Sequence, residues 1–460
     1  MDQSLVFDIE LIRRYDKSGP RYTSYPTAVQ FHEGFAEADY RAVAAQSNQQ
    51  GGPLSLYFHI PFCDTLCFYC ACNKIATKNR KHAVPYLEAL FKEIEMQGAL
   101  FDRSRKVDQL HWGGGTPTFI SHEQMTALMV KSREQFNLHD DDSGEYSIEI
   151  DPREVKNDTI KLLRGLGFNR MSLGVQDFDP KVQQAVNRIQ TEAQTFAVLD
   201  QAKAEGFLSV SVDLIYGLPF QSLEGFAKTV DKVIAAGPDR LSVFNYAHLP
   251  EMFKPQRRIL DKDLPSAAEK LEILQMTNER LKQAGYVYIG MDHFAKPDDE
   301  LAVAQREGTL YRNFQGYSTH AECDLVAMGV TSIGMVGNTY SQNVKTVEAY
   351  AELINAGKLP VYRGVELDDD DVLRREVITR LICQFELDMG AIAQQFNIDF
   401  SEYFAPEMEE IRQIESDGLL TIDGDRIRVL PAGRLLIRNV CMVFDKYLRK
   451  QTEQRFSKVI

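Results

Sequence analysis

Four of the seven cysteines of this chain lie within ten residues, between Cys63 and Cys72. The other three cysteines are isolated from one another along the sequence. Cysteines this closely spaced are typical of metal or cluster ligands, and a structural disulfide is the alternative reading. The group, called the cysteine loop below, contains Cys63, Cys67, Cys70 and Cys72.

The spacing within the cysteine loop favours an iron–sulfur cluster over zinc. Structural zinc usually takes two separated pairs of ligands, and the chain has no second pair of nearby cysteines. Iron–sulfur clusters accept closely spaced thiolates from one segment. Cys63, Cys67 and Cys70, at the spacing C-x3-C-x2-C, would hold three irons of a [4Fe–4S] cluster and leave the fourth iron open. An open iron can bind a reacting ligand, as the open position of catalytic zinc does.

This spacing, with the aromatic Tyr69 just before the last ligand, resembles the radical S-adenosylmethionine (SAM) superfamily. In that superfamily the open iron chelates SAM, so the resemblance implies a [4Fe–4S] cluster held by Cys63, Cys67 and Cys70. A fourth cysteine ligand would close the cluster and leave no position for SAM. We therefore expect the surplus thiol, Cys72, to lie beside the cluster or on the substrate side.

Alternating strands and helices are expected to position the cysteine loop. Directly before it, apolar residues at 54, 56, 58 and 60 alternate with polar or aromatic ones, which predicts a β-strand. Comparable patterns predict strands at 107–112, 146–151, 171–176, 208–214 and 241–246. Because helical patterns separate these strands, the strands should pair in parallel. Six such units predict an α/β fold with a partial (β/α)6 TIM-like barrel of the radical SAM type, short of the eight units that close a barrel.

Polar residues recur on one face of these strands, near the strands' C-terminal ends. The outer face of barrel strands packs on helices, and the inner face lines the lumen. A sealed core would not tolerate many unpaired polar groups, although any one of them could be a hydrogen-bonded core residue. We therefore expect a binding cavity whose reacting groups lie at the C-terminal rim, where the cysteine loop begins. The polar residues are Tyr57, His59, Glu149, Gln176 and Asp213.

A glycine-rich segment, His111–Pro117, ends the second predicted strand. Its three consecutive glycines let the backbone approach a ligand closely, although many such runs are simple turns. Placed after a strand, it resembles the loop that holds the methionyl amino group of SAM in the superfamily. The resemblance implies contacts from Gly114, Gly115 and Thr116, with Thr116 at a position where many members have glutamate.

The regions on either side of the predicted barrel differ from it. Residues 1–50 contain Gly-Pro and Tyr-Pro pairs and predict an extended arm, followed by a helix at 35–50. The region 361–460 predicts a mostly helical, winged-helix-like cap domain, with helices at 372–388, 390–397, 401–417 and 433–448 and a hairpin at 421–430. The expected domains are therefore 1–50, 51–360 and 361–460.

The charge of the chain argues against nucleic acid as a partner. The formal net charge is −14, and the predicted helix at 401–417 is acidic, so both would repel phosphate. The first residues lack the basic and apolar regions of a signal peptide, and no run of about 18 apolar residues occurs. We expect a cytoplasmic protein without a membrane span.

Four further segments carry a narrower resemblance: Arg21–Ala28, Cys70–Lys74, Asn313–Tyr317 and Arg434–Tyr447. Together they look like the oxygen-independent coproporphyrinogen III oxidase (dehydrogenase) family, over nearly the whole chain. The resemblance implies that two propionates of coproporphyrinogen III are decarboxylated to vinyl groups, giving protoporphyrinogen IX in haem synthesis. The reduced cluster would cleave SAM to methionine and a 5′-deoxyadenosyl radical, which would remove a hydrogen from the propionate β-carbon.

The family resemblance also implies a second SAM molecule beside the first. The first SAM is expected to contact Tyr57, Gly114, Gly115, Thr116 and Ile333, with Glu149 near both molecules. The second is expected to contact Tyr69, Gln176, Arg188, Asp213 and Ala247. Tyr57 and Glu149 are the implied catalytic residues. Residue 69 is Tyr here, where the best-known members are expected to have Phe, and a stacking contact would survive that change.

The resemblance implies coproporphyrinogen III as the substrate, a flavodoxin- or ferredoxin-like electron donor, and a monomer. The substrate carries four carboxylates although the chain is acidic, so local cations must bind it, and Arg21 and Arg438 are the candidates. The arm is expected to close over the substrate.

One alternative to this enzymatic function is a haem-binding chaperone of the same superfamily, which we expect to lack the fourth close cysteine and the arm. The other is a zinc-stabilised interaction protein.

Overall fold

The computed structural model describes residues 5–156 and 158–450, and the chain divides into two compact units. The first, called the helical unit, comprises Met1–Gln30, Ala267–Ala321 and Leu367–Ile460. The second, called the barrel unit, comprises Phe31–Ser266 and Glu322–Glu366. This grouping by contacts differs from the predicted boundaries at residues 50 and 360, which follow breaks in the sequence. The three-domain division therefore stays a prediction.

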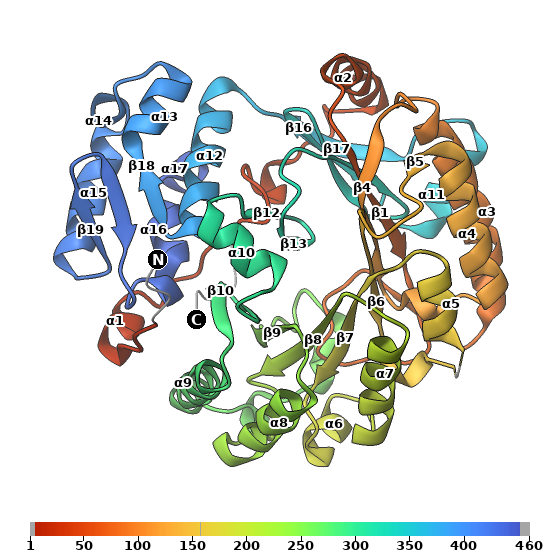
Figure 1. The fold of residues 1–460 in the computed structure, drawn as a ribbon, viewed down its shortest axis with the longest axis horizontal. Helices are drawn as coiled ribbons and strands as arrows, with labels where there is room; N and C mark the ends of the chain where they lie inside the picture. The colour runs from red at the N-terminus through yellow and green to blue at the C-terminus, as the bar shows by residue number, and fades with distance from the viewer. Residues whose placement is uncertain (1–4, 157, 451–460) are drawn as a thin grey trace. The chain divides into compact units, whose positions relative to one another are not determined.

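Six parallel strands form the core of the barrel unit, in the order β1-β4-β6-β7-β8-β9 (Figure 1). Their bounds are Leu54–Ile60, Lys106–Gly114, Glu145–Ile150, Arg170–Gln176, Ser209–Tyr216 and Arg240–Asn245. Helices follow successive strands and cover the outer face of the sheet. They are α3 (Ala83–Gly98), α4 (His122–Gln135), α5 (Thr159–Gly165), α6 (Pro180–Ala185), α7 (Glu192–Ala204) and α8 (Leu223–Ala236). The prediction of a partial (β/α)6 barrel is confirmed.

Further strands extend this sheet on the other side of β1. β14 (Asp324–Met328) pairs in parallel with β1. The antiparallel strands β15 (Ile333–Val336), β16 (Thr339–Asn343) and β17 (Val361–Glu366) follow, with α11 (Val347–Asn355) between the last two. In the part of the chain that the structure describes, no pairing joins β9 to β17. The barrel is therefore open.

The alternation along the strands separates a core from the lumen. On β8, for example, Val210, Val212 and Leu214 are buried, and the residues between them are only partly buried. Trp112 on β4 is fully buried and packs edge-on against Phe168, with ring centroids 4.9 Å apart. Burial of each large apolar side chain contributes about 1.5–3 kcal/mol, so the outer face of the sheet is a rigid support for the rim.

A buried hydrogen-bond network ties α3 to the extension strands. Glu93 on α3 accepts hydrogen bonds from the Gly329 N–H (2.7 Å), Asn343 Nδ2 (2.9 Å) and the Tyr350 hydroxyl. Burial raises the pKa of Glu93 to about 7, against the opposing effect of these donors. The neighbouring Tyr86 hydroxyl donates to the carbonyl oxygen at the end of β1, at 2.6 Å. The network therefore holds the turn at residues 329–333 against the C-terminal end of β1.

The helical unit contains the predicted winged-helix-like region. Its helices are α12 (Asp369–Gln384), α13 (Met389–Phe396), α14 (Phe400–Tyr403), α15 (Ala405–Ser416), α16 (Ile437–Val443) and α17 (Lys446–Lys450), and its sheet is β18 (Glu386–Asp388), β20 (Arg426–Val429) and β19 (Leu420–Asp423). The predicted helix at 372–388 ends earlier because Phe385 adopts a left-handed conformation with φ 56° and the next residues pair with β20. The predicted helix at 433–448 is interrupted after Val443.

Residues 267–321 of the helical unit alternate between helices and short hairpins. The elements are α9 (Ala267–Gln283), β10 (Val287–Gly290), β11 (His293–Ala295), α10 (Glu300–Glu307), β12 (Tyr311–Asn313) and β13 (Gly316–Ser318). β10 pairs with β11, and β12 pairs with β13. The segment Asn313–Tyr317, one of the four that carry the family resemblance, is thus the turn of a hairpin.

The N-terminal arm is less extended than predicted. A short helix, α1 (Ile9–Arg14), follows the capping residue Asp8, whose carboxylate accepts hydrogen bonds from the N–H groups of residues 10 and 11 at 3.0 Å each. Within the helical unit, the Tyr22 hydroxyl donates to Asp445 at 3.0 Å, and Arg438 donates to the carbonyl oxygens of Gly19 and Pro20. The predicted helix at 35–50 is confirmed as α2 (Glu37–Gln50), in the barrel unit.

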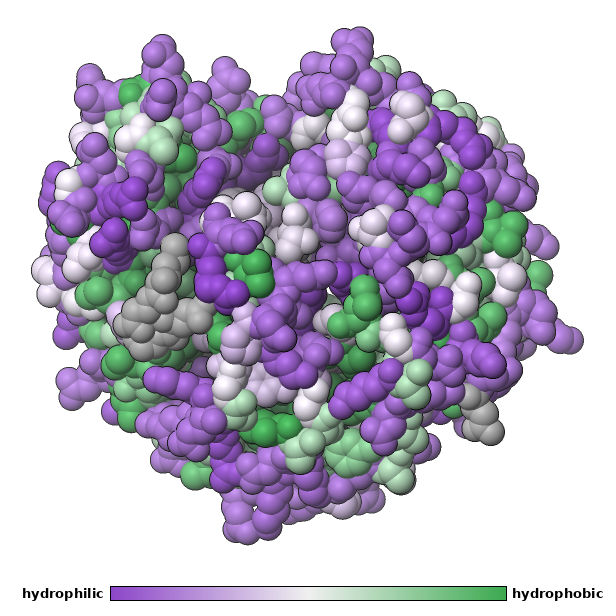
Figure 2. Space-filling view, viewed as in Figure 1, coloured by the Kyte–Doolittle hydropathy of each residue, from purple (hydrophilic) through white to green (hydrophobic). Residues whose placement is uncertain are grey.

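The surface has no extensive apolar area on the face drawn in Figure 2, where hydrophobic residues are scattered among hydrophilic ones. Among the described residues, none of the helices combines the length and the apolar composition that crossing a membrane requires.

Candidate functional site at the rim of the barrel

The cysteine loop begins where β1 ends and is closed at its base by backbone pairing. β2 (Phe62–Cys63) and β3 (Ile75–Ala76) pair in parallel. The Ile75 N–H donates to the Pro61 carbonyl at 2.7 Å, and the Thr77 N–H donates to the Cys63 carbonyl at 2.8 Å. The loop is therefore fixed at the C-terminal rim of the barrel, as predicted, where reacting groups of parallel barrels lie.

All seven cysteines are free thiols in the structure, and those of the loop lie among hydrogen-bond donors. Thr116 Oγ1 donates to Cys63 Sγ at 3.6 Å. Two guanidinium groups, of Arg153 and Arg188, donate to Cys67 Sγ, also at 3.6 Å each. These donors and cations suit a thiolate bound to iron, since hydrogen bonds and positive charge stabilise the negative charge on its sulfur.

Cys72 lies beside Cys70. The pKa of Cys70 is lowered to about 6, first by its interaction with the neighbouring Cys72 thiol and also by the charge of Lys74. The Lys74 ammonium donates to the Cys70 carbonyl at 2.9 Å. Cys72 is thus adjacent to the three predicted ligands without belonging to their C-x3-C-x2-C spacing.

The glycine segment after β4 packs directly against the cysteine loop. The N–H groups of Gly115 and Thr116 donate to the carbonyls of Ile60 and Phe62, at 2.8 Å each. A Cβ atom at Gly115 would come within 2.7 Å of the Phe62 carbonyl oxygen and 3.0 Å of Cys63 Sγ. Gly114 adopts φ +117°, which strongly favours glycine. The backbone here therefore forms a cradle beside the cysteines that a side chain would fill.

Tyr57 and Glu149 lie in the lumen on either side of His111. The rings of Tyr57 and His111 are stacked, with centroids 5.8 Å apart, and His111 Nε2 lies 3.5 Å from Glu149 Oε1. The Gly114 N–H donates to Glu149 Oε2 at 3.1 Å. Burial alone would raise the pKa of Glu149, but the hydrogen bonds and charge of His111 and the N–H of Gly114 lower it. Glu149 therefore presents a carboxylate to the lumen at neutral pH.

A buried ion cluster connects the segments that follow β6 and β7 to the cysteine loop. Asp151 Oδ2 accepts from Arg153 Nη2 at 2.6 Å and from Arg188 Nη1 at 3.1 Å. Burial raises the pKa of Asp151, but the two guanidiniums outweigh it and lower the pKa to about 2. Because the same guanidiniums reach Cys67, Asp151 fixes their position. Asp151 and Arg153 were absent from the predicted site, although Asp151 ends the predicted strand at 146–151 and Arg153 follows it closely.

Three polar residues line the lumen: Gln176 and Asn245, the last residues of β7 and β9, and Asp213, within β8. Gln176 follows a register shift in β7 and has φ +67°, which is costly for a residue other than glycine. Gln176 Oε1 and Asn245 Oδ1 are buried, and neither has a hydrogen-bond partner among the described residues. Buried polar atoms are usually paired, so these two indicate that a polar ligand completes the site. Asn245 was not predicted as a site residue, although it lies one residue before the end of the predicted strand at 241–246.

Asp213 is the second carboxylate of the lumen and differs from Glu149 in its surroundings. It accepts from Ser172 Oγ at 3.0 Å and is also hydrogen-bonded to Ser242. Burial raises the pKa of Asp213 to about 6, although both serines oppose this. A cationic ligand beside Asp213 would offset the cost of its charge.

Polar side chains connect the segments that contain three other predicted residues, Tyr69, Ala247 and Ile333. Gln256 Nε2 donates to the carbonyls of Tyr69 (2.9 Å) and Ala247 (3.2 Å), so it joins the cysteine loop to the segment after β9. Asn73 donates to Thr331 Oγ1 at 3.3 Å, two residues before Ile333.

Arg21 and Arg438, the predicted substrate-binding cations, lie in the helical unit, where Arg21 pairs with Asp292 and Arg438 donates to the Pro20 carbonyl of the arm.

Known proteins resemble the chain over both units. Residues 57–233 match the model of the radical SAM superfamily, and residues 367–436 match that of the HemN C-terminal domain. The oxygen-independent coproporphyrinogen III oxidase of Pseudomonas aeruginosa is 55% identical over 460 residues, 100% of both chains. That of Escherichia coli strain K12 is 51% identical over 459 residues, 100% of this chain and 99% of the relative.

One solved structure also resembles the chain over nearly its whole length. Coproporphyrinogen III oxidase (HemN) from Escherichia coli, described as a radical SAM enzyme, has a TM-score of 0.92 and 50% sequence identity. The match covers 96% of this chain and 100% of that chain. The likeness therefore includes both the open barrel and the helical unit.

Proposed function

Because this chain belongs to the oxygen-independent coproporphyrinogen III oxidase family, we propose that it is a radical SAM enzyme that converts coproporphyrinogen III to protoporphyrinogen IX. Two propionates become vinyl groups. Each conversion removes one hydrogen atom from a propionate β-carbon, releases carbon dioxide and passes one electron to an acceptor. The proposal depends on one observation above all, the C-x3-C-x2-C loop at the rim of an open barrel in a chain similar to these oxidases over its full length.

Cys63, Cys67 and Cys70 are the proposed ligands of the [4Fe–4S] cluster. When bound, the cluster and SAM supply one-electron cleavage of a carbon–sulfur bond and a radical able to abstract hydrogen. The chain supplies the surroundings: Thr116 donates to Cys63, and Arg153 and Arg188 donate to Cys67. The soft thiolate donors fit iron.

Two SAM positions are proposed in the lumen. The first SAM molecule would be bound by Tyr57, Gly114, Gly115, Thr116 and Ile333. The second would be bound by Tyr69, Gln176, Arg188, Asp213 and Ala247. Glu149 would lie near both molecules. The carboxylates of Glu149 and Asp213 support this assignment. Each can accept a hydrogen bond from the ammonium group of a SAM molecule or lie beside its sulfonium charge. The unpaired oxygen of Gln176 supports a polar ligand beside Asp213.

Tyr57 and Glu149 are the proposed catalytic residues. Burial and the charge of Glu149 keep the pKa of Tyr57 well above its ordinary value, so its hydroxyl stays a hydrogen-bond donor. The lowered pKa of Glu149 keeps this carboxylate an acceptor. Together they would orient a ligand at the rim.

The proposed partners are coproporphyrinogen III and a flavodoxin- or ferredoxin-like electron donor, and the proposed state is a cytoplasmic monomer. The net charge of −14 supports the absence of nucleic acid. The segments 1–50, 51–360 and 361–460 are proposed as arm, catalytic domain and cap. The haem-chaperone alternative is not favoured, because the full-length relatives are named as oxidases.

An anaerobic decarboxylation assay tests the proposal. Protein reconstituted with iron and sulfide is mixed with SAM, dithionite, an electron acceptor and coproporphyrinogen III, and the vinyl products are separated by chromatography. We expect protoporphyrinogen IX from the parent protein and none from Cys67→Ala. SAM cleavage without vinyl products, together with stoichiometric haem binding, would instead identify a carrier.

A further inference from the structure

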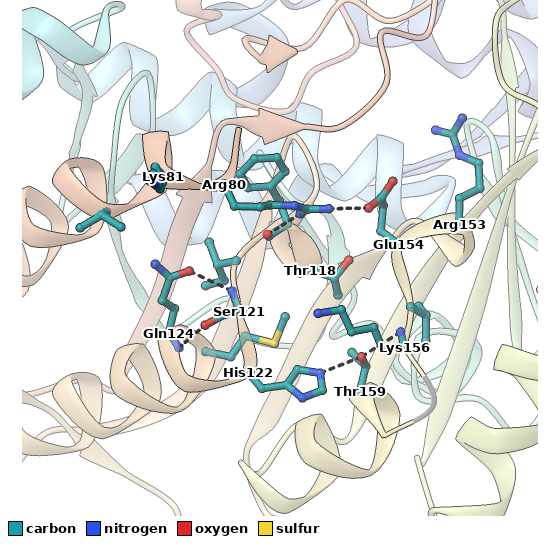
Figure 3. A pocket seen from close by; sticks show the side chains of 15 residues that line it. Arg80, Lys81, Thr118, Ser121, His122, Gln124, Arg153, Glu154, Lys156 and Thr159 are labelled. Carbon is teal, nitrogen blue, oxygen red and sulfur yellow. Dashed lines mark hydrogen bonds and ion pairs between the residues drawn. The ribbon is translucent and has the colours of Figure 1, made fainter. Parts of the chain in front are cut away.

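Three buried arginines of this chain are each held by a carboxylate. They form the pairs Arg105–Asp324 (2.6 Å), Arg188–Asp151 (3.1 Å) and Arg374–Glu407 (3.0 Å). Even the exposed Arg80, in the cavity of about 480 Å³ drawn in Figure 3, pairs with Glu154 at 2.8 Å. A charged side chain that is removed from water needs such a partner, because its lost hydration must be replaced.

Arg312, on β12 of the helical unit, departs from this pattern. It is 7% exposed, and no salt bridge reaches it within the described residues. Its Nη1 is buried and has no hydrogen-bond partner among those residues. Its Nε donates to the Arg21 carbonyl at 3.4 Å, outside the usual range for such a bond, and its guanidinium lies over the Tyr317 ring, 4.7 Å from the centroid. These contacts orient the guanidinium without compensating its charge.

Two acidic groups of the helical unit act on the same region, and both are bound to other arginines. Asp292 pairs with Arg21, whose carbonyl accepts from Arg312. Glu376 acts, as Arg312 does, on a buried thiol of α12, and it pairs with Arg380 at 2.7 Å. Each carboxylate therefore has its own cation, and neither supplies the counter-charge that Arg312 lacks.

The groups that gather around Arg312 are positive charges and hydrogen-bond donors. Burial and then the charges of Arg21 and Arg312 lower the pKa of Arg438 to about 10, so the three guanidiniums lie within electrostatic reach of one another. Gln315 Nε2, at the turn between β12 and β13, is a further buried donor with no partner in the described part of the chain. A ligand that completes this region must therefore be an acceptor with negative charge.

We propose that Arg312 binds a propionate carboxylate of the substrate, and that this propionate is one of the two that the reaction retains. The inference rests on the proposed function, which supplies a substrate with four carboxylates. An ion pair to a reacting propionate would be lost as carbon dioxide leaves, so it would oppose the reaction, whereas a retained propionate keeps its partner throughout. The carboxylate accepts from Nη1, the nitrogen that has no partner in the free protein.

The test measures substrate binding separately from stability. Arg312→Met and Arg312→Lys are compared with the parent and with Arg306→Met, a matched control whose exposed guanidinium also donates to a backbone carbonyl, at 2.7 Å. Binding of coproporphyrin III, the oxidised and unreactive form of the substrate, is followed by its fluorescence. A second probe, deuteroporphyrin IX, carries only the two propionates that the product retains. KM and kcat are measured with coproporphyrinogen III, and thermal melting is followed by circular dichroism.

We expect Arg312→Met to bind both porphyrins about tenfold more weakly or worse, because a buried guanidinium–carboxylate pair is lost. KM should rise by a similar factor, with kcat within about twofold of the parent, as for an interaction made equally in the ground and transition states. Arg312→Lys keeps the charge and should lose less. Arg312→Met should melt at or above the temperature of the parent, because it removes a buried charge without a partner. Arg306→Met should bind as the parent does.

Unchanged porphyrin binding in Arg312→Met would overturn the inference, and so would weaker binding accompanied by a lower melting temperature in both Arg312 variants. A loss for coproporphyrin III but not for deuteroporphyrin IX would also overturn it, because Arg312 would then hold a reacting propionate. A parent protein that neither binds coproporphyrin III nor forms vinyl products would instead refute the proposed function, and the inference with it.

Discussion

Replacement of Asp213 by Asn should stabilise the barrel unit while weakening its ligand site. Asp213 lies on β8, with its carboxylate toward Ser172 and Ser242 in the lumen. Burial raises its pKa from 3.8 to about 6, with a further rise from the charge of Glu149 and an opposing effect of Arg188. A buried carboxylate that no bound cation neutralises therefore costs stability in the free protein.

The sign and size of this effect follow from linkage. Between about pH 4 and pH 6 the unfolded chain releases the proton of residue 213 before the folded chain does, so this residue lowers stability as the pH rises. The difference between 3.8 and about 6 corresponds to up to about 3 kcal/mol above pH 6, since one pKa unit is about 1.4 kcal/mol. Asp213→Asn removes that cost. It should be close to neutral at pH 4 and stabilising at pH 8.

Urea unfolding at several pH values measures the effect. Trp112 is the only tryptophan of the chain and lies in the barrel unit, so its fluorescence reports this unit alone. Asp200→Asn, on the exposed face of α7, is the matched control and should show no such dependence on pH. Asp213→Asn should also bind SAM more weakly, because the carboxylate that lowers the stability of the free protein is the group that would interact with the cationic ligand. A variant less stable than the parent at pH 8, or a difference independent of pH, would refute the reasoning.

Three further changes have defined outcomes. Glu93→Ala should destabilise the barrel unit by about 3 kcal/mol or more, because three buried donors lose their acceptor, as followed by Trp112 fluorescence. Gly115→Ala should lower the iron content after reconstitution, because its Cβ would collide with the cysteine loop, whereas Gly165→Ala, with open space around it, should not. Arg438→Met should speed proteolysis of the N-terminal arm, because two arm carbonyls lose their donor; an unchanged cleavage rate would contradict that role.

The barrel could be predicted from the sequence because the patterns that indicate strands and helices involve residues close together in the chain. Strand alternation and the helices between strands set the six units, and the cysteine loop and glycine segment were expected at the rim where they are found. The short helix α1 and the early end of α12 were not predicted. They depend on the cap by Asp8 and on the left-handed conformation of Phe385, which periodicity does not report.

The polar contacts that assemble the rim could not be predicted, since they join residues far apart in the chain. Gln256 reaches Tyr69, and Arg188 reaches Cys67, across more than a hundred residues. Arg188 itself was expected from the family resemblance, but its pairing with Asp151 was not.

Iron analysis of single cysteine variants tests the central claim most directly. Each of Cys63→Ala, Cys67→Ala and Cys70→Ala, reconstituted without oxygen, should lose the cluster. Cys72→Ala should keep the iron and sulfide content of the parent and release 5′-deoxyadenosine with dithionite and SAM. Loss of the cluster from Cys72→Ala as well would show that four thiolates hold the iron and leave none open for SAM.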